Sequence, residues 1–127
     1  MEGGCLCGKI RFTSSVEPKS VVNCHCNNCK RSVGAAYITW AVFQKDCISF
    51  NITPPTYTAP NRAVRTFCDT CGTSIAYWHP NRESVIDITV GCLDDPEKCP
   101  PERNIWTKKR LSWIEDPGDI PDHLIYP

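Results

Sequence analysis

Seven of the ten cysteines in this 127-residue chain lie in three short clusters that have the spacing of metal ligands. The clusters are Cys5 and Cys7; Cys24, Cys26 and Cys29; and Cys68 and Cys71. Four thiolates complete the tetrahedral shell of a zinc ion, so seven divide into one complete set of four and one incomplete set of three. The sequence therefore predicts a structural zinc site and a second, reactive zinc site with one position left for another ligand.

A disulfide framework is the competing explanation for an even number of cysteines in a short chain. Residues 1–8 contain neither a basic segment nor an apolar segment of the kind that directs secretion. Cysteines two positions apart, such as Cys5 and Cys7, also bridge each other with difficulty. We therefore expect metal-bound thiolates in a reducing compartment, namely the cytoplasm, with the nucleus left open as an alternative.

Composition indicates one domain without a membrane segment. We expect residues 1–127 to form a single zinc-binding domain, because no linker or shift in composition divides the chain. Lys plus Arg and Asp plus Glu each number 14, so the formal charge is zero and gives no general attraction to nucleic acid or to an anionic membrane. No apolar run approaches the roughly 20 residues of a membrane helix.

Short segments rich in β-branched and aromatic residues predict a mainly β fold made of short antiparallel strands around the zinc sites. The expected strands are residues 9–13, 21–23, 35–42, 48–51, 64–67, 73–78 and 84–90, and residues 27–32 are expected to form one helical turn. In the last strand, alternation places Ile86 and Ile88 on one face and Asp87 and Thr89 on the other, so that strand should be half buried. Trp113 and Ile120 could anchor the Pro-rich tail to the core.

The segment Cys68-Asp69-Thr70-Cys71-Gly72 has the form of a zinc knuckle, in which a tight turn directs two sulfurs at one metal. Cys5 and Cys7 can reach one ion together, because residues two apart on an extended strand share a face. A redox dithiol at Cys68 and Cys71 would need a βαβ context that this strand-rich sequence does not offer.

Four segments of the chain, in order, resemble the glutathione-dependent formaldehyde-activating enzyme family, which includes centromere-protein-V-like members. These segments are residues 4–12 (GCLCGKIRF), 24–31 (CHCNNCKR), 67–73 (FCDTCGT) and 91–96 (GCLDDP). The resemblance implies a β-tent fold and indicates which cysteines bind each zinc ion. It implies a structural zinc on Cys5, Cys7, Cys68 and Cys71 and a catalytic zinc on Cys24, Cys26 and Cys29.

A zinc ion with three thiolates carries a net charge of about −1, so it acidifies water less than an ion held by neutral imidazoles. A soft thiolate is its natural fourth ligand, which favours a substrate thiol such as glutathione. Together with this preference, the resemblance implies the activity of a zinc-dependent carbon–sulfur lyase acting on a thiol–aldehyde adduct such as S-hydroxymethylglutathione, with glutathione and formaldehyde as partners.

Glutathione carries two carboxylates, so its site needs cations near the metal. Lys30 and Arg31 directly follow Cys29 and are the first candidates for cofactor and substrate binding, with Arg62 and Arg65 as further candidates. His25 lies between two expected ligands on an extended segment, so its side chain should point away from the metal.

Three features leave alternatives open. Members of the family commonly carry a histidine where this chain has Asn104, so the departure removes an imidazole that could contact substrate. Cys92 could supply a fourth sulfur to the second zinc, which would make the protein a non-catalytic zinc-binding module for a protein or nucleic acid partner. A reductase with Cys92 or Cys99 as nucleophile is a third possibility.

Overall fold

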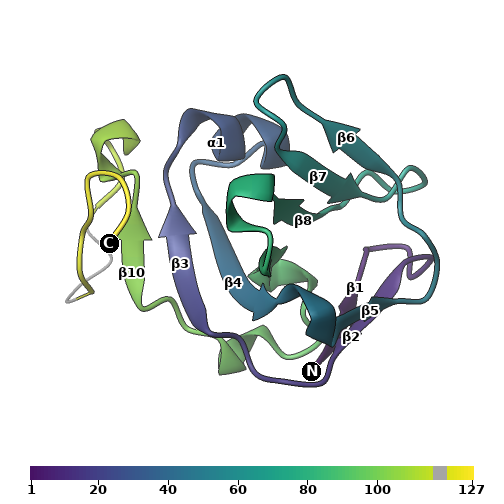
Figure 1. Ribbon diagram of the computed structural model, residues 1–127. Helices are drawn as coiled ribbons and strands as arrows, with labels where there is room; N and C mark the ends of the chain where they lie inside the picture. The colour runs from purple at the N-terminus through teal and green to yellow at the C-terminus, as the bar shows by residue number, and fades with distance from the viewer. Residues whose placement is uncertain (116–119) are drawn as a thin grey trace.

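Ten short strands form two β-sheets in the computed structural model, which describes residues 1–115 and 120–127 (Figure 1). The smaller sheet has the strand order β1-β2-β5 and is antiparallel. Its strands are β1 (Glu2–Gly4), β2 (Arg11–Ser14) and β5 (Ile48–Phe50). The mainly β fold predicted from the sequence is therefore confirmed.

The larger sheet has the order β10-β3-β4-β9-β8-β7-β6, and all its neighbouring strands are antiparallel except β10 and β3. Its strands are β3 (Ser20–Cys24), β4 (Ile38–Gln44), β6 (Thr56–Thr58), β7 (Val64–Phe67), β8 (Ser74–Trp78), β9 (Val85–Thr89) and β10 (Arg103–Ile105). In Figure 1 this sheet runs from β10 beside the C-terminal segment to β6 at the opposite side of the molecule. It therefore brings distant parts of the chain onto one continuous surface.

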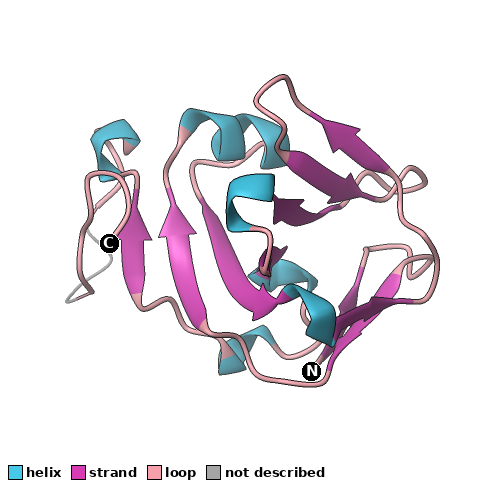
Figure 2. Ribbon diagram, in the orientation of Figure 1, coloured by secondary structure: helices cyan, strands magenta, loops and turns pink. Residues whose placement is uncertain are grey.

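One α-helix, α1 (Asn27–Val33), follows β3 and lies at one end of the larger sheet (Figure 1). Figure 2 shows that the other helical segments are single turns in the connections between strands. These 3₁₀ turns are Lys45–Cys47, Pro80–Arg82, Val90–Cys92, Pro96–Lys98 and Thr107–Lys109. No helix in the described part of the chain is long and apolar enough to cross a membrane.

All seven strands expected from the sequence are present, with ends shifted by up to three residues, and the helical turn expected at residues 27–32 begins α1. The sequence pattern missed β1, β6 and β10, which have three residues each. A three-residue strand is too short to show alternation, and β10 forms only because it pairs in parallel with the distant β3.

The expectation that strand β9 would be half buried is wrong. Ile86 and Ile88 lie in the main hydrophobic core, but Asp87 and Thr89 on the other face are also buried, at 7% and 4% exposure. The reason is that β9 lies in the middle of the larger sheet, between β4 and β8, and that Arg82 packs against Asp87. Asp87 is therefore a buried charge that needs a function or a partner.

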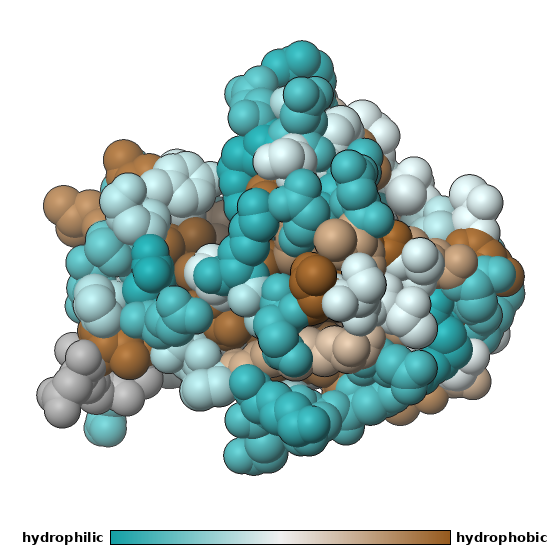
Figure 3. All heavy atoms as spheres, turned by 60° about the horizontal axis from the view of Figure 1, so that its bottom comes forward, coloured by the Kyte–Doolittle hydropathy of each residue, from teal (hydrophilic) through white to brown (hydrophobic). Residues whose placement is uncertain are grey.

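Trp113 does not anchor the tail, because 70% of its surface is exposed. Ile120 is half buried, and residues 116–119 of the tail lie outside the described part of the chain. Figure 3 shows a mainly hydrophilic face with small hydrophobic patches, some at the side where the C-terminal segment lies in Figure 1.

Candidate metal centres and active-site cavity

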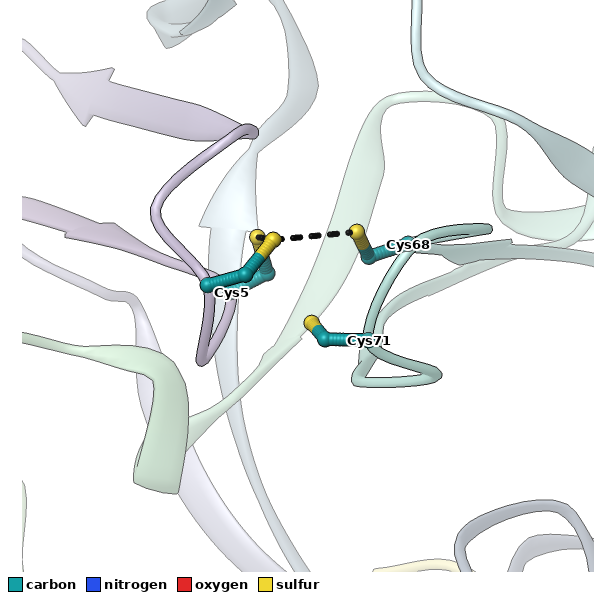
Figure 4. Close-up of side chains that lie close together, drawn as sticks. Cys5, Cys68 and Cys71 are labelled. Atoms are coloured by element: carbon teal, nitrogen blue, oxygen red, sulfur yellow. Dashed lines mark hydrogen bonds between the residues drawn. The ribbon is translucent and has the colours of Figure 1, made fainter.

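The first cysteine cluster joins the two sheets. Cys5 and Cys7 lie in the connection from β1 to β2, whereas Cys68 and Cys71 lie in the turn from β7 to β8. Their four sulfur atoms all lie within 4.8 Å of one another. Figure 4 shows the side chains of Cys5, Cys68 and Cys71 directed at one common point. The cluster thus links segments about 60 residues apart, as a structural metal does.

The sulfur spacing in this cluster matches zinc. Zinc–sulfur bonds of about 2.3 Å in a tetrahedron place the sulfurs roughly 3.8 Å apart. The Sγ atoms of Cys5 and Cys7 are 3.6 Å apart, and those of Cys7 and Cys68 are 3.8 Å apart. Disulfide sulfurs would be at about 2 Å, and all ten cysteines are free thiols. The donor set and its spacing therefore fit a tetrahedral zinc ion.

Backbone groups hold these sulfurs in place. The N–H group of Ile10 donates a hydrogen bond to the Sγ atom of Cys5 at 3.3 Å. Gly8 and Gly72 close the two cysteine turns with φ angles of 80° and 78°, which a residue with a side chain rarely adopts. A hydrogen bond from the hydroxyl of Thr73 lowers the pKa of Cys71 to about 5. The turns therefore hold the four sulfurs close together, and Cys71 favours the thiolate form.

The second cluster lies where β3 passes into α1. Cys24 ends β3, Cys26 is the N-cap of α1, and Cys29 lies in the first turn of the helix. Their three sulfurs also lie within 4.8 Å of one another. The Sγ atom of Cys26 accepts a hydrogen bond from the Cys29 N–H at 3.3 Å. Hydrogen bonds from Cys24 and Cys29 strongly lower the pKa of Cys26, so the cluster favours a thiolate.

These three cysteines line a cavity of about 620 Å³ over one face of the larger sheet. Cross-strand pairing sets Arg65, Tyr77 and Asp87 opposite one another on β7, β8 and β9, and Asp87 pairs with Val42 of β4. All four line the cavity. The cavity wall is therefore built by the register of strands that are remote in sequence.

Four cationic side chains among the described residues line this cavity. They are Arg65, Arg82, Arg103 and Lys109. The Nη2 atom of Arg65 lies 3.7 Å from the Cys29 Sγ atom, and its guanidinium lies 4.8 Å from the centre of the Tyr77 ring. Burial raises the pKa of Tyr77 to about 12, so its phenol keeps its proton at neutral pH. The cavity thus combines thiols, cations and a hydrogen-bond donor.

An ion pair between a buried carboxylate and a partly exposed guanidinium completes the wall of the cavity. Arg82 donates two hydrogen bonds to the carboxylate of Asp87, at 3.0 and 3.2 Å. Burial raises the pKa of Asp87, while the hydrogen bonds and charge of Arg82 oppose the rise. Alternation along β9 predicts that Asp87 faces solvent, so no sequence signal places this residue in the cavity.

Lys30 and Arg31, the cations first expected to bind the substrate, are not among the described residues that line this cavity. The Nζ atom of Lys30 instead donates to the backbone carbonyl of Lys109 at 2.7 Å. Arg31 lines a neighbouring cavity on the other side of Arg65. Arg62, a further candidate, donates to Asn81 at 3.2 Å. Of the four candidates, Arg65 alone reaches a thiol of the second cluster, within the described residues.

Cys92 does not join the second cluster in the described structure. Its Sγ atom donates to the backbone carbonyl of Ser74 at 3.5 Å, and its side chain packs in the main core with Cys5. The metal-ligand group around Cys24 has three members among the described residues. The fourth sulfur that a closed, non-catalytic site would require is therefore not supplied by Cys92. Cys99 is likewise buried in the core, with its Sγ atom 3.9 Å from the Sδ atom of Met1.

Asn104 and His25 lie on the side of β10 and β3 that faces away from the cavity. The Asn104 amide oxygen accepts a hydrogen bond from Asn23 at 3.1 Å and lies 3.4 Å from the His25 Nε2 atom. Its Nδ2 atom donates to Asp122 at 2.9 Å. The His25 ring stacks on Tyr37 at 5.1 Å. The departure at Asn104 therefore alters a buried polar network behind the cysteines, and not the wall of the cavity.

Comparison with known proteins identifies the relatives of this chain. The family model described as glutathione-dependent formaldehyde-activating enzyme matches residues 1–109. A Schizosaccharomyces pombe protein named as an uncharacterized lyase is 27% identical over 112 residues, covering 77% of this chain and 82% of the relative. A Halomonas elongata protein whose name is that of the same family is 24% identical over 127 residues, covering 91% and 80% of the two chains.

One solved structure shows a similar fold. A crystal structure of a Rhodobacter sphaeroides protein superimposes with a TM-score of 0.62 and 18% sequence identity. The match covers 97% of this chain and 100% of the other. Both cysteine clusters lie within the 109 residues that the family model covers.

Proposed function

Because the chain belongs to the glutathione-dependent formaldehyde-activating enzyme family, we propose that it is a zinc-dependent carbon–sulfur lyase. Its substrate is an adduct of glutathione, or another thiol, with an aldehyde, such as S-hydroxymethylglutathione. One observation carries the proposal: the sulfurs of Cys24, Cys26 and Cys29 converge at the wall of a cavity that also presents four cationic side chains. A thiol that bears carboxylates is complementary to that combination.

The two cysteine clusters have different roles in this proposal. Cys5, Cys7, Cys68 and Cys71 hold a structural zinc that joins the two sheets. Cys24, Cys26 and Cys29 hold the catalytic zinc and present it to the cavity. This zinc supplies the positive charge that keeps the substrate thiol ionised. A cytoplasmic location agrees with thiols that must stay reduced.

The reaction itself needs an oriented sulfur and a proton. The thiol sulfur forms a bond to the aldehyde carbon, the carbonyl π electrons move to oxygen, and that oxygen gains a proton while the thiol loses one. Tyr77 lines the same cavity and keeps its phenol proton, so it donates a hydrogen bond to the oxygen as charge develops there. The reverse reaction releases the aldehyde by the same steps.

The cations of the cavity bind and position the thiol. We assign anion binding to Arg65, Arg103 and Lys109, in place of Lys30 and Arg31, because the former three line the cavity. Arg65 also stabilises negative charge on the thiolate cluster through its contact with Cys29. A guanidinium suits this task because its planar fork matches a carboxylate.

Two-dimensional exchange NMR of formaldehyde and glutathione tests the proposal. The zinc-loaded protein is expected to raise the exchange rate above that of the spontaneous reaction, and Cys26→Ser is expected to abolish the gain. Cys47→Ser is the matched control, because Cys47 is a half-buried free thiol outside both clusters and should retain full activity. An exchange rate equal to the spontaneous rate at full zinc loading would contradict the proposal.

A further inference from the structure

Among the described residues that line the cavity, Asp87 is the one with a carboxylate side chain, and it faces four cations. A site that recognised carboxylates alone would gain nothing from a buried negative charge, which costs free energy and weakens the field of the cations. Asp87 therefore calls for an explanation within the chemistry of the ligand.

The bonding of Asp87 is incomplete. An ionised carboxylate offers about four lone-pair positions, and a bidentate guanidinium fills two of them. Arg82 fills these two, and no other residue in the described structure donates a hydrogen bond to Asp87. Tyr77 and Val42, its cross-strand neighbours, belong to the same cavity wall. Two acceptor positions are thus left for a donor that enters the cavity.

Arg82 also has hydrogen-bond donors that Asp87 does not occupy. A guanidinium has five N–H donors, and Asp87 accepts two of them. The side chain of Arg82 is 38% exposed, compared with 9% for Asp87, so its remaining donors are accessible. The pair therefore presents a cation and an anion side by side.

An α-amino acid group has the matching pattern, with an ammonium and a carboxylate on adjacent atoms. We propose that Asp87 binds the ammonium and Arg82 the carboxylate of such a group, so that the cavity selects a zwitterionic thiol peptide. This inference rests on the proposed function, since it names the part of the thiol substrate that the cavity recognises. The γ-glutamyl end of glutathione carries this group, and the cations Arg103 and Lys109 remain for the second carboxylate.

Binding measurements test this recognition without the reaction. S-methylglutathione keeps the γ-glutamyl group but has no free thiol, and its desamino analogue, S-methyl-glutaryl-cysteinylglycine, lacks only the ammonium. Titration calorimetry of the zinc-loaded protein is expected to give a Kd roughly ten- to a hundredfold higher for the desamino compound, the effect of one charged hydrogen-bonded pair. Asp87→Asn is expected to bring the two Kd values together.

The control variant is Asp95→Asn, because Asp95 is exposed, lies outside the cavity and pairs with Lys98. It should keep the wild-type ratio of Kd values. Equal Kd values for the two compounds with the wild-type protein would overturn the inference, even if Asp87→Asn failed to fold. Exchange NMR with glutathione distinguishes a failure of this inference from a failure of the proposed function. A protein that accelerates the exchange of formaldehyde with glutathione, but binds both compounds equally well, is still a lyase.

Discussion

The Arg65 Nη2 atom lies 3.7 Å from the Cys29 Sγ atom, so a guanidinium from β7 contacts a thiol from α1. The other terminal nitrogen of Arg65 donates to the Ser32 hydroxyl at 2.9 Å, which fixes the guanidinium against the helix. A cation at this distance stabilises a thiolate relative to a thiol. Arg65 thereby connects the cysteine cluster to the row of cross-strand residues that forms the cavity wall.

Arg65→Met is expected to lower kcat/KM about tenfold or more, because it removes one charged hydrogen-bonded contact and a substrate cation. Met keeps the aliphatic stem of Arg65 but not its guanidinium, so the contact of the guanidinium with the Tyr77 ring is lost as well. Exchange NMR over a range of glutathione concentrations measures the effect. Lys98→Met, which removes an exposed cation far from the cavity, should leave kcat/KM unchanged. An unaltered kcat/KM in Arg65→Met would show that the contact has no catalytic role.

Cys68→Ser is expected to release the structural zinc and to lower the melting temperature by about 10 °C or more, since a few kcal/mol shift a domain of this size by that amount. The cause is that Cys68 is fully buried and its cluster links the two sheets. Metal analysis and thermal denaturation measure the two effects. Cys47→Ser again provides the matched control. A variant with full zinc content and an unchanged melting temperature would refute the structural role.

The three short runs of cysteines could be recognised from sequence because each run is local: Cys24, Cys26 and Cys29 lie within six residues, and their spacing alone indicates a metal site. The joining of Cys5 and Cys7 with Cys68 and Cys71 is not local and is implied by the family resemblance. The same closeness in sequence to Cys29 favours Lys30 and Arg31 as substrate-binding cations. Successive residues on a helix are rotated by about 100°, so the two residues after Cys29 point in other directions.

Arg65 is among the sequence candidates for substrate binding, but the places of Tyr77 and Asp87 in the cavity wall could not be predicted, because they depend on strand register. Arg65, Tyr77 and Asp87 are separated by ten or more residues, and they form one row only after β7, β8 and β9 pair. Nothing in a single sequence fixes which residues stand opposite one another. Alternation in β9 correctly separated its two faces, but it could not show that the polar residues are also buried.

Asn104→Ala is expected to reduce the free energy of unfolding by about 1–3 kcal/mol, because it leaves the buried side chains of Asn23 and His25 without their hydrogen bonds to Asn104. The exposed Asp122 also loses a hydrogen bond but keeps those from Arg110. The KM for glutathione should change little, since Asn104 faces away from the cavity. Urea denaturation gives the first quantity and exchange NMR the second. A large rise in KM with unchanged stability would instead place Asn104 in substrate binding.

Asp122 should make the protein lose stability in acid. Hydrogen bonds from Arg110 lower the pKa of this carboxyl below its ordinary value of 3.8. The unfolded chain therefore binds more protons than the folded chain as the pH falls from about 4 through the lowered pKa, and stability falls with it. Asp122→Asn cannot bind this proton, so its melting temperature should depend less steeply on pH between 5 and 3, as scanning calorimetry would measure. If the melting temperatures of the wild-type protein and Asp122→Asn changed equally with pH, Asp122 would not contribute to the loss of stability in acid.

Tyr77→Phe is expected to lower kcat about ten- to a hundredfold, the usual effect of losing one donor to a developing oxyanion. The ring contacts with Trp40 at 6.2 Å and with Arg65 at 4.8 Å do not involve the hydroxyl, so folding and zinc content should be preserved. Because burial holds the Tyr77 pKa at about 12, the wild-type rate gain should not fall between pH 7 and 9 through ionisation of this group. Tyr77→Phe should therefore reduce the rate gain over the spontaneous reaction by the same factor at every pH from 7 to 9. A purely structural role would instead lower the melting temperature and leave kcat of the folded fraction intact, so the two measurements together decide whether the phenol takes part in the reaction.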